Sequence, residues 1–256
     1  MADWNSELYM KFERERTRAA GDLLAQLGPY RPESVVDLGC GPGNSTQLLL
    51  TAFPEAKITG VDLSENMLAV ARARVAGAEF LQQDIEDWRP ERPVDLIFAN
   101  ATLHFSKDHY GLIERLAACL APGGALAVQM PNNMQESSHA AMRMISADEP
   151  WAERLVPIAK TRAVIGPPDE YYRLLAPRCA TLDIWQTIYF HQVESIDRIV
   201  EWFEGSELRP FLKPLSPKER EMFLARYRRE LEEAYSPQPD GKVLMRYPRL
   251  FFIART

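Results

Sequence analysis

The sequence predicts an α/β protein in which a doubly wound, mainly parallel sheet carries helical insertions. Three observations support this fold class. Apolar, β-branched stretches alternate with stretches of helical periodicity up to residue 131. A glycine-rich turn directly follows the first of these apolar stretches. Beyond residue 131 the alternation stops, and helical pieces broken by proline surround two further strand-like stretches.

The composition excludes several classes of function. The 256 residues are 46% hydrophobic and carry a formal net charge of -6, so a nucleic-acid partner that needs a basic stripe is not expected. Apolar runs stay short of membrane-spanning length, and Met1 to Trp4 lacks the pattern of a signal peptide. We therefore expect no membrane association and a cytoplasmic location. The 3 cysteines are far apart, which predicts neither disulfides nor a metal site.

The N-terminal segment combines aromatic residues with a helix. Its apolar residues recur at helical spacing, at Leu8, Phe12, Leu23, Leu24 and Leu27. Gly28-Pro29 ends the helix. The segment contains three aromatic residues, Trp4, Tyr9 and Phe12, which is more than a solvent-facing tail requires. Two interpretations stay open: the segment packs on the sheet edge, or it closes over a bound ligand and excludes water.

The first strand and its turn form the central motif. Val35 to Leu38 predicts a buried strand, and Gly39, Gly41 and Gly43 follow with the spacing G-x-G-x-G. We expect Asn44 or Ser45 to cap the helix after them, so that free N–H groups face the strand end. Dinucleotide sites need G-x-G-x-x-G, and Asn44 occupies the place of the third glycine. In addition, Asp37 would repel a pyrophosphate but attract a cation.

The next units repeat the strand-helix pattern. Lys57 to Asp62 predicts a second strand that ends in an acid, and such an acid can accept hydrogen bonds from ribose hydroxyls. Ser64 is expected to cap the following helix. Glu79 to Gln83 predicts a third strand, and Asp84-Ile85 follows it. Val94 to Asn100 is almost wholly apolar, as a central parallel strand should be.

The remaining chain completes the sheet and adds insertions. A helix capped by Ser106 and a strand over Ala125 to Met130 follow the central strand. We divide the chain into a core with the N-terminal helix, two helical insertions that cap the site, and two edge strands: residues 1–131, residues 132–178 and 192–242, and residues 179–191 and 243–256. Ser216 and Glu219 form a capping box within the second insertion.

The acid and glycine motif, Asp37 to Gly43, resembles that of the class I S-adenosylmethionine-dependent methyltransferases. The resemblance implies a Rossmann-like, seven-stranded sheet whose last strand runs antiparallel between the fifth and the sixth. It also implies S-adenosyl-L-methionine as the cofactor, with Asp84 and Ile85 at the adenine. The implied cofactor-binding residues are Asp37, Gly39, Gly41, Gly43, Asp62, Leu63, Met67, Asp84, Ile85 and Asn100.

A narrower resemblance runs nearly end to end, to those members of the family that methylate trans-aconitate, a small polycarboxylic acid. The matching stretches are Asp3-Trp4-Asn5 with Leu8-Tyr9, Asp37 to Ser45, Asp95 to Ala101, Val128 to Pro131, Asp183-Ile184-Trp185, Leu208-Arg209-Pro210 and Pro248-Arg249-Leu250-Phe251. The resemblance implies esterification of one carboxylate. Three alternatives stay open: another small-molecule acceptor, a non-catalytic cofactor-binding module, and a nicotinamide dehydrogenase.

The acceptor site is less defined by the sequence. A carboxylate, with an ordinary pKa near ~4, is already a nucleophile at neutral pH, so no catalytic general base is expected. Arg209 is the first candidate to bind the acid, although an internal ion pair with Glu207 or Glu204 is the alternative. Tyr189 and His191 are weaker candidates, with Arg249 weaker still. Tyr9 and His104 are further candidates. His104 either contacts the substrate or caps a helix.

Overall fold

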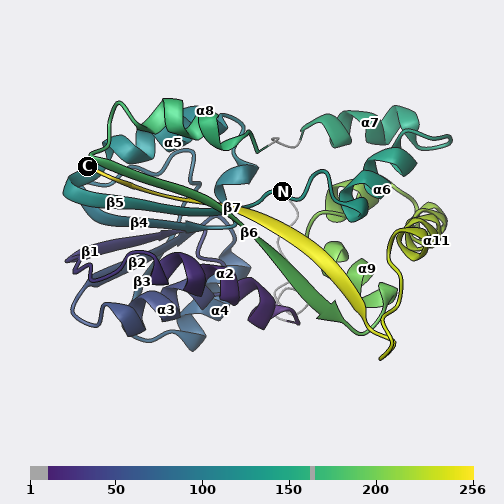
Figure 1. Ribbon diagram of the computed structural model, residues 1–256, viewed down its shortest axis with the longest axis horizontal. Helices are drawn as coiled ribbons and strands as arrows, with labels where there is room; N and C mark the ends of the chain where they lie inside the picture. Colours follow the sequence, from purple (N-terminus) through teal and green to yellow (C-terminus); the bar gives the residue numbers. More distant parts are fainter. Residues whose placement is uncertain (1–10, 162–164) are drawn as a thin grey trace.

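A computed structural model describes residues 11–161 and 165–256 and shows a seven-stranded sheet with helices on both faces (Figure 1). The strands lie in the order β3-β2-β1-β4-β5-β7-β6. Pairing is parallel from β3 to β5, whereas β7 runs antiparallel to both β5 and β6. The predicted Rossmann-like fold, with its last strand antiparallel between the fifth and the sixth, is therefore confirmed.

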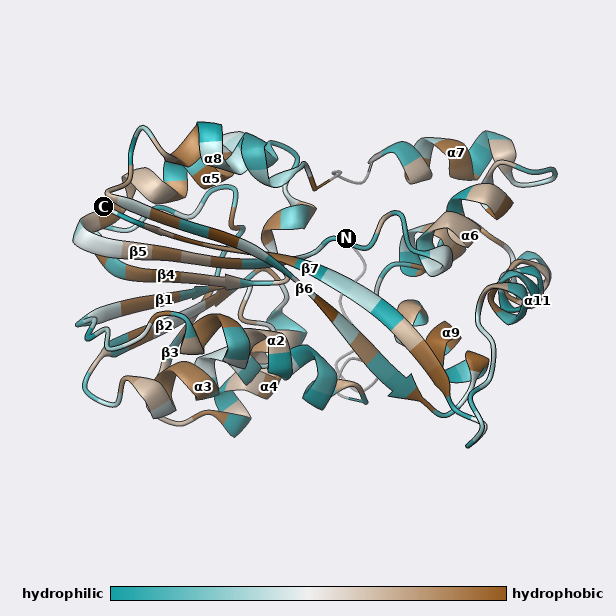
Figure 2. Cartoon of the chain, in the orientation of Figure 1, coloured by the Kyte–Doolittle hydropathy of each residue, from teal (hydrophilic) through white to brown (hydrophobic). Residues whose placement is uncertain are grey.

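The strands have these bounds: β1 (Ser34–Leu38), β2 (Lys57–Asp62), β3 (Glu79–Gln82), β4 (Val94–Asn100), β5 (Leu120–Pro131), β6 (Thr181–Val193) and β7 (Val243–Arg255). Strand β4 coincides with the apolar run in the sequence. It is central in the sheet and buried over most of its length, which explains why it lacks an alternating polar face. Figure 2 shows the hydrophobic residues concentrated in the sheet, while the visible surface of α11 is mostly hydrophilic.

Two layers of helices cover the sheet. Helices α2 (Glu13–Ala25), α3 (Asn44–Ala52) and α4 (Glu65–Arg74) lie on one face, and α5 (His109–Ala118) and α8 (Pro168–Leu175) lie on the other (Figure 1). A short 3₁₀ helix, η1 (Leu103–Phe105), follows β4. Although α8 falls within the first expected insertion, it packs against α5 and β6 like a helix of the core.

The helix caps differ in part from those expected. Ser64 caps α4 by accepting a hydrogen bond from the Met67 N–H at 3.3 Å, as predicted. The expectation for α3 is wrong, because Gly43 occupies the N-cap position. The expectation for Ser106 is also wrong. Asp108 caps α5, and the Ser106 hydroxyl instead donates to Glu86 at 2.7 Å.

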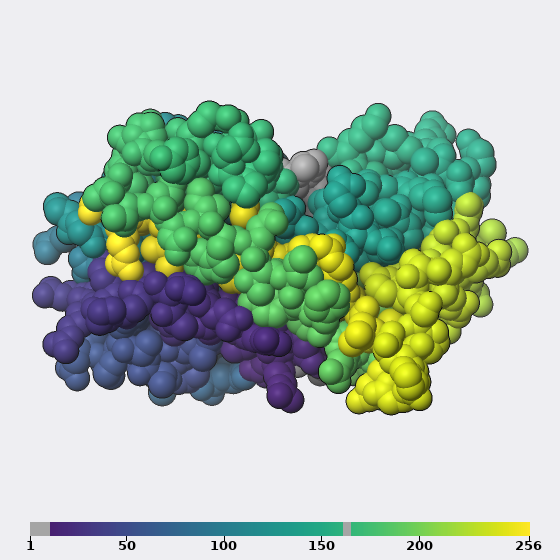
Figure 3. All heavy atoms as spheres, viewed as in Figure 1, coloured from purple at the N-terminus to yellow at the C-terminus, as the bar shows by residue number. Residues whose placement is uncertain are grey.

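The remaining helices form a second lobe beside the strand ends, here called the cap. They are α6 (Ser137–Ser146), α7 (Ala152–Thr161), α9 (Ile196–Glu204), α10 (Arg209–Leu212) and α11 (Pro217–Ala234). Helix α11 begins with the predicted capping box and packs against α6 and α9. Figure 3 shows the two lobes and the strands that run between them.

A two-stranded ribbon connects the lobes. Strands β6 and β7 stay paired from end to end, but β7 pairs with β5 only from Arg249 to Arg255. The remaining part, residues 188–193 with residues 243–248, therefore leaves the sheet as a ribbon (Figure 1). On this ribbon Tyr189 and His191 are buried, whereas Ile188 and Phe190 are exposed. Helix α9 packs against β6, which places the second lobe over the strand ends.

The helices that the structure describes in residues 11–161 and 165–256 include none that is long and apolar enough to cross a membrane.

Candidate active site

The glycine turn joins β1 to α3 in a left-handed backbone. Gly39 has a φ of 68°, and a Cβ there would lie 2.0 Å from the Thr102 hydroxyl oxygen. Gly41 has a φ of 55°, but a Cβ there would meet nothing within 4 Å. Both residues need glycine for their backbone, and only Gly39 also needs it for packing. The turn is thus packed against the β4–η1 loop on one side and open at Gly41.

Asp37, in β1, stabilises this turn through side-chain hydrogen bonds. Its carboxylate is fully buried and accepts hydrogen bonds from the hydroxyls of Ser45, at 2.7 Å, and Thr46, at 2.6 Å. Burial raises the pKa of Asp37 to about 6, although both hydroxyls oppose the shift. These contacts tie the end of β1 to the first turn of α3. Direct contact between Asp37 and a cofactor stays a prediction.

Asp62, at the end of β2, is held beside the turn by backbone donors. One carboxylate oxygen accepts from the Gly41 N–H at 2.9 Å, and the other accepts from the Ser64 N–H at 2.8 Å. The next residue, Leu63, leaves 45% of its surface exposed, while Met67 beneath it is buried. An oriented acid next to an open apolar side chain is suited to a ribose and its attached base.

The predicted adenine residues lie one strand further along the sheet. Strand β2 pairs with β3 so that Asp62 lies opposite Gln82, and Asp84 follows two residues beyond that strand end. The Asp84 carboxylate accepts a hydrogen bond from the Glu86 N–H at 3.0 Å, and Ile85 is half-buried against the core. The structure therefore brings Asp62, Asp84 and Ile85 to one edge of the sheet. Their contact with a cofactor stays a prediction.

Two neighbouring cavities open at the carboxyl ends of the strands. The first, here the turn cavity, encloses about 300 Å³ between α2, Gly39, Pro42 and Ser45. The second, here the strand-end cavity, encloses about 470 Å³ between β4, η1, β7 and the cap. Arg16 and Asn100 line both cavities. The Asn100 Oδ1 atom is buried and has no hydrogen-bond partner in the part of the chain that the structure describes.

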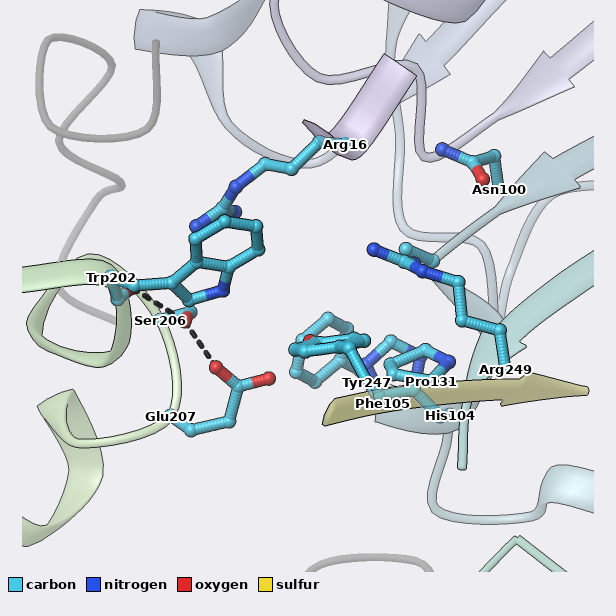
Figure 4. Close-up of a pocket in the computed structure, with 11 residues that line it drawn as sticks. Arg16, Asn100, His104, Phe105, Pro131, Trp202, Ser206, Glu207, Tyr247 and Arg249 are labelled. Carbon is cyan, nitrogen blue, oxygen red and sulfur yellow. Dashed lines mark hydrogen bonds between the residues drawn. The ribbon is translucent and has the colours of Figure 1, made fainter. Parts of the chain in front are cut away.

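Two arginines give the strand-end cavity its positive charge. Arg249, on β7, is only 3% exposed and donates to the Gln129 side-chain oxygen at 3.1 Å. Its guanidinium carbon lies 4.6 Å from the ring centre of Tyr247. Arg16, on α2, lies over the Trp202 ring at 5.2 Å. Figure 4 shows the Arg16 side chain running to the Trp202 ring, whereas the Arg249 guanidinium extends into the space between Asn100 and Tyr247.

Aromatic and polar side chains complete the walls of this cavity. His104 and Phe105 come from η1, with ring centres 4.0 Å apart, and Trp202 comes from α9 in the cap. Glu207 follows α9 and is hydrogen-bonded by the Ser206 hydroxyl, as Figure 4 shows. The cavity thus combines aromatic walls with polar groups, with two cations on the core side and one carboxylate on the cap side.

The expected acceptor residues are only partly brought together. His104 lines the strand-end cavity. Tyr189 and His191 lie behind it: the Tyr189 hydroxyl donates to Asp22 at 2.6 Å, and the two rings are parallel at 6.1 Å. Arg209 begins α10 and is absent from the described lining of the cavity. Tyr9 lies outside the described residues.

The surroundings of His191 confirm that this region is electropositive. Burial, together with the charges of Arg249 and Arg18, lowers the pKa of His191 to about 4. The imidazole is therefore neutral at physiological pH. A ring held neutral behind the Arg249 side chain leaves the arginine charges available to an anion.

The sequence did not indicate Arg16, which lines the cavity, or Gln129, which accepts the hydrogen bond from Arg249. Arg16 is one of several charged residues on an amphipathic helix, and spacing alone did not distinguish it from its solvent-exposed neighbours. Gln129 is the polar residue in the apolar stretch from Ala125 to Met130, and this position was a signal that could have revealed it. Arg249 was ranked last among the candidates, yet it is the most buried cation of the cavity.

Comparison with known proteins now identifies the family. The family described as a methyltransferase domain matches residues 35–124. A trans-aconitate 2-methyltransferase from Rhodopseudomonas palustris strain BisA53 is 49% identical over 99% of each chain. A second relative of that name, from Methylobacterium nodulans, is 51% identical over 100% of this chain and 99% of its own.

The chain belongs to the trans-aconitate 2-methyltransferase family.

Solved structures agree with this family at the level of the fold. The YcgJ protein of Bacillus subtilis superposes with a TM-score of 0.61 at 15% identity, covering 93% of this chain and 98% of its own. A phosphoethanolamine N-methyltransferase from Haemonchus contortus, solved with S-adenosylhomocysteine, gives a TM-score of 0.54 at 17% identity over 93% of this chain and 52% of its own. The members of the family thus share a methyltransferase fold, and the motif at Asp37 to Gly43 is its glycine turn.

Proposed function

We propose that this protein transfers a methyl group from S-adenosyl-L-methionine to one carboxylate of trans-aconitate, with the monomethyl ester and S-adenosylhomocysteine as products. Relatives of this name match the chain over its whole length. The proposal includes the cytoplasmic location expected from the sequence, and a small acid in place of a nucleic acid as the acceptor.

The residues of the turn and of the sheet edge fit the donor. The space beside Gly41 is open to a ligand, and the Asp62 carboxylate is fixed by two backbone N–H groups. In this proposal Asp62 binds the ribose, Asp84 receives the adenine amino group, and Leu63 and Ile85 cover the ring. When bound, the donor supplies an electrophilic methyl group on a sulfonium centre.

The acceptor needs no general base from the protein. Its carboxylate is ionised at neutral pH, so an oxygen lone pair can form the new bond to carbon while the carbon–sulfur bond breaks. The protein's contribution is alignment, together with exclusion of water by the cap. Good alignment of two reactants is worth about 7–11 kcal/mol of the barrier. Arg16 and Asn100, which line both cavities, are placed to shape the contact between them.

One observation carries the proposal: the cavity beside the glycine turn is lined by two arginines, Arg16 and Arg249. A planar guanidinium pairs with a carboxylate through two parallel hydrogen bonds, and a buried guanidinium attracts an anion strongly. A trianion with two carboxylates at these arginines would keep its third carboxylate for the methyl group. A nicotinamide or a neutral acceptor would form no carboxylate–guanidinium pair with these arginines.

A methyl-transfer assay tests the proposal. The purified protein is incubated with S-adenosyl-L-methionine and each of a panel of small acids, including trans-aconitate, cis-aconitate, citrate and fumarate, and the esters are measured by mass spectrometry. We expect trans-aconitate to give the highest kcat/KM and a single monomethyl ester. Binding of S-adenosylhomocysteine without ester formation from any acid would instead favour a non-catalytic module.

A further inference from the structure

Gln129 is an unusual residue for its position. It lies in β5, between β4 and β7, and is completely buried. Its neighbours from Ala125 to Met130 are apolar and buried. A buried amide is costly unless both of its polar atoms are satisfied. A leucine or methionine would fill this place at lower cost, so the retention of a glutamine indicates a use beyond packing.

The contacts of Gln129 connect it with the strand-end cavity. Its Oε1 atom accepts the hydrogen bond from the Arg249 guanidinium at 3.1 Å. Gln129 is also the register partner of Asn100 on β4, so the two side chains leave the sheet on the same face. Asn100 and Arg249 line the cavity on either side of it. The three residues form a polar row across three neighbouring strands, in which Gln129 and Arg249 are buried and Asn100 is half-buried.

The charge of this contact matters. Arg249 donates a hydrogen bond to the neutral amide of Gln129, and its guanidinium also lies over the Tyr247 ring. A glutamate at position 129 would hold the guanidinium equally well but would cancel its charge. A neutral acceptor fixes the orientation of the fork without itself neutralising the guanidinium.

We propose that Gln129 is a positioning residue, which holds the Arg249 guanidinium in the orientation that receives a carboxylate of the acceptor. The inference rests on the proposed function, since it concerns the same cavity. The geometry leads to it through the buried amide, its bond to Arg249 and the cavity that Arg249 lines. Because binding then requires no ordering of a long side chain, the preoriented arginine increases affinity for the acid.

Two substitutions separate orientation from charge. Gln129→Met keeps the approximate shape but removes the acceptor, and Gln129→Glu keeps an acceptor but neutralises Arg249. We expect KM for trans-aconitate to increase at least fivefold with Met and at least thirtyfold with Glu. In both variants kcat should stay within threefold of wild type, and the Kd for S-adenosylhomocysteine should be unchanged, because neither Gln129 nor Arg249 lines the turn cavity.

The matched control is Gln186→Met, the same substitution at an exposed position of β6. It should leave every measured quantity unchanged. A merely structural role for Gln129 would lower the melting temperature and reduce kcat and donor binding together. That result, or an unchanged KM in both variants, would overturn the proposal.

A measurement on the wild type covers the case in which the variants fail to fold. The side-chain amide of Gln129 is followed by NMR in protein saturated with S-adenosylhomocysteine while trans-aconitate is added. We expect its resonances to shift with the same Kd as the binding curve, because the neighbouring guanidinium gains a partner. Resonances that stay fixed during saturation would contradict the inference. If the wild type methylates no acid in the panel, the proposed function itself fails, and this outcome is seen before any variant is made.

Discussion

At the scale of single residues, the main problem is how an acidic protein binds an anion. Arg16 and Arg249 come from opposite ends of the chain, and the fold brings them to one cavity. Of the two cavities, Arg249 lines only the strand-end cavity, whereas Arg16 lines both. The donor carries a carboxylate in its methionine part. We therefore expect Arg16 to contact both ligands and Arg249 only the acceptor.

This difference gives the first prediction. Arg16→Met should weaken the binding of S-adenosylhomocysteine and, in its presence, of trans-aconitate, whereas Arg249→Met should weaken only the acid. Hydrogen bonds to charged groups contribute about 1.5–3 kcal/mol each, so each affected Kd should increase roughly tenfold or more. Isothermal titration calorimetry measures both constants. Arg14→Met, at an exposed position of the same helix, is the control. Equal effects of the two substitutions on donor binding would contradict the assignment.

A second prediction at this scale concerns His191 and pH. Its pKa is lowered to about 4 in the folded protein by burial and by the nearby arginines, while the unfolded chain binds a proton near 6.5. Between these values the unfolded state holds more protons, so His191 reduces stability as the pH falls from 6.5 toward 4. Asp37 acts in the opposite direction, because burial raises its pKa to about 6. A comparison with a variant isolates the histidine.

His191→Phe keeps an aromatic ring beside Trp202 and Tyr247 but does not titrate. Urea unfolding at pH 7 and pH 5 gives the free energy of unfolding of both proteins. Relative to the variant, the wild type should lose about 2 kcal/mol between these two pH values. A difference between the proteins that does not change with pH would mean that His191 is accessible to protons in the folded state.

Single residues were predictable where a short motif fixes their surroundings. Asp62, Asp84 and the glycines follow strands, and parallel strands end at the same edge, so the sequence indicated one site. Arg16 and Arg249 depend on packing between α2, the cap and β7, which no local pattern records. Arg209 was preferred because of its neighbours in sequence, but the structure places it at the start of α10, and its role stays a prediction.

At the scale of elements, the glycine turn shows how one backbone serves two purposes. Gly39 lies against Thr102, and Gly41 faces open space, although both have a positive φ. Gly28 also has a positive φ, of 62°, with open space around it, but it follows α2 and takes no part in the turn. Substitutions at these three glycines therefore distinguish three effects: backbone strain alone at Gly28, strain with a packing clash at Gly39, and strain with reduced space for the ligand at Gly41.

The third prediction uses this comparison. Alanine at Gly28 or Gly41 should cost about 1–2 kcal/mol of stability from the left-handed backbone alone. Only Gly41→Ala should also weaken the binding of S-adenosylhomocysteine, because its methyl group would occupy the space next to the turn. Gly39→Ala should be the least stable, since its Cβ would overlap Thr102. Thermal unfolding and calorimetry test all three. A Gly41→Ala protein with normal donor affinity would place the donor elsewhere.

The elements themselves were largely predictable, and their caps were not. Apolar periodicity located β4 and most other strands closely, because burial on both faces leaves a continuous apolar run. Caps depend on which of several adjacent polar residues reaches the helix end. Ser106 and Asp108 were both suitable by type, and the nearby Glu86 carboxylate takes the Ser106 hydroxyl. This competition is decided by a neighbour distant in sequence.

At the scale of the whole molecule, the ribbon of β6 and β7 determines where the cap lies. The sequence indicated that residues 179–191 and 243–256 are edge strands, but not that their outer halves leave the sheet together. The alternation from Thr181 to His191 predicted Tyr189 and His191 on the non-core face, and this prediction is wrong, because both are buried. That outcome depends on α2 and α9, which contact the ribbon only in the folded protein.

The whole molecule also acts on the acceptor through its net charge. The protein carries a formal net charge of -6, and the radius of gyration of a compact chain of this length is about 18 Å. In water without salt, the repulsion between this charge and a trianion at that distance sums to about 4 kcal/mol. The Debye length is roughly 30 Å at 0.01 M salt and 8 Å at 0.15 M, so salt removes about 2 kcal/mol of this repulsion. The buried arginines act at close range and are screened much less.

The last prediction follows from this balance. Pairing between surface cations and an anion normally weakens with salt, but here the long-range repulsion should dominate the salt dependence. We expect KM for trans-aconitate to fall at least threefold when sodium chloride is raised from 0.01 to 0.15 M, while the Kd for S-adenosylhomocysteine, whose net charge is near zero, changes little. Arg249→Met should keep this salt dependence, because the substitution removes a buried local charge and leaves the distant charges in place. A KM that increases with salt in the wild type would show that exposed cations at the entrance, and not the buried arginines, attract the acid.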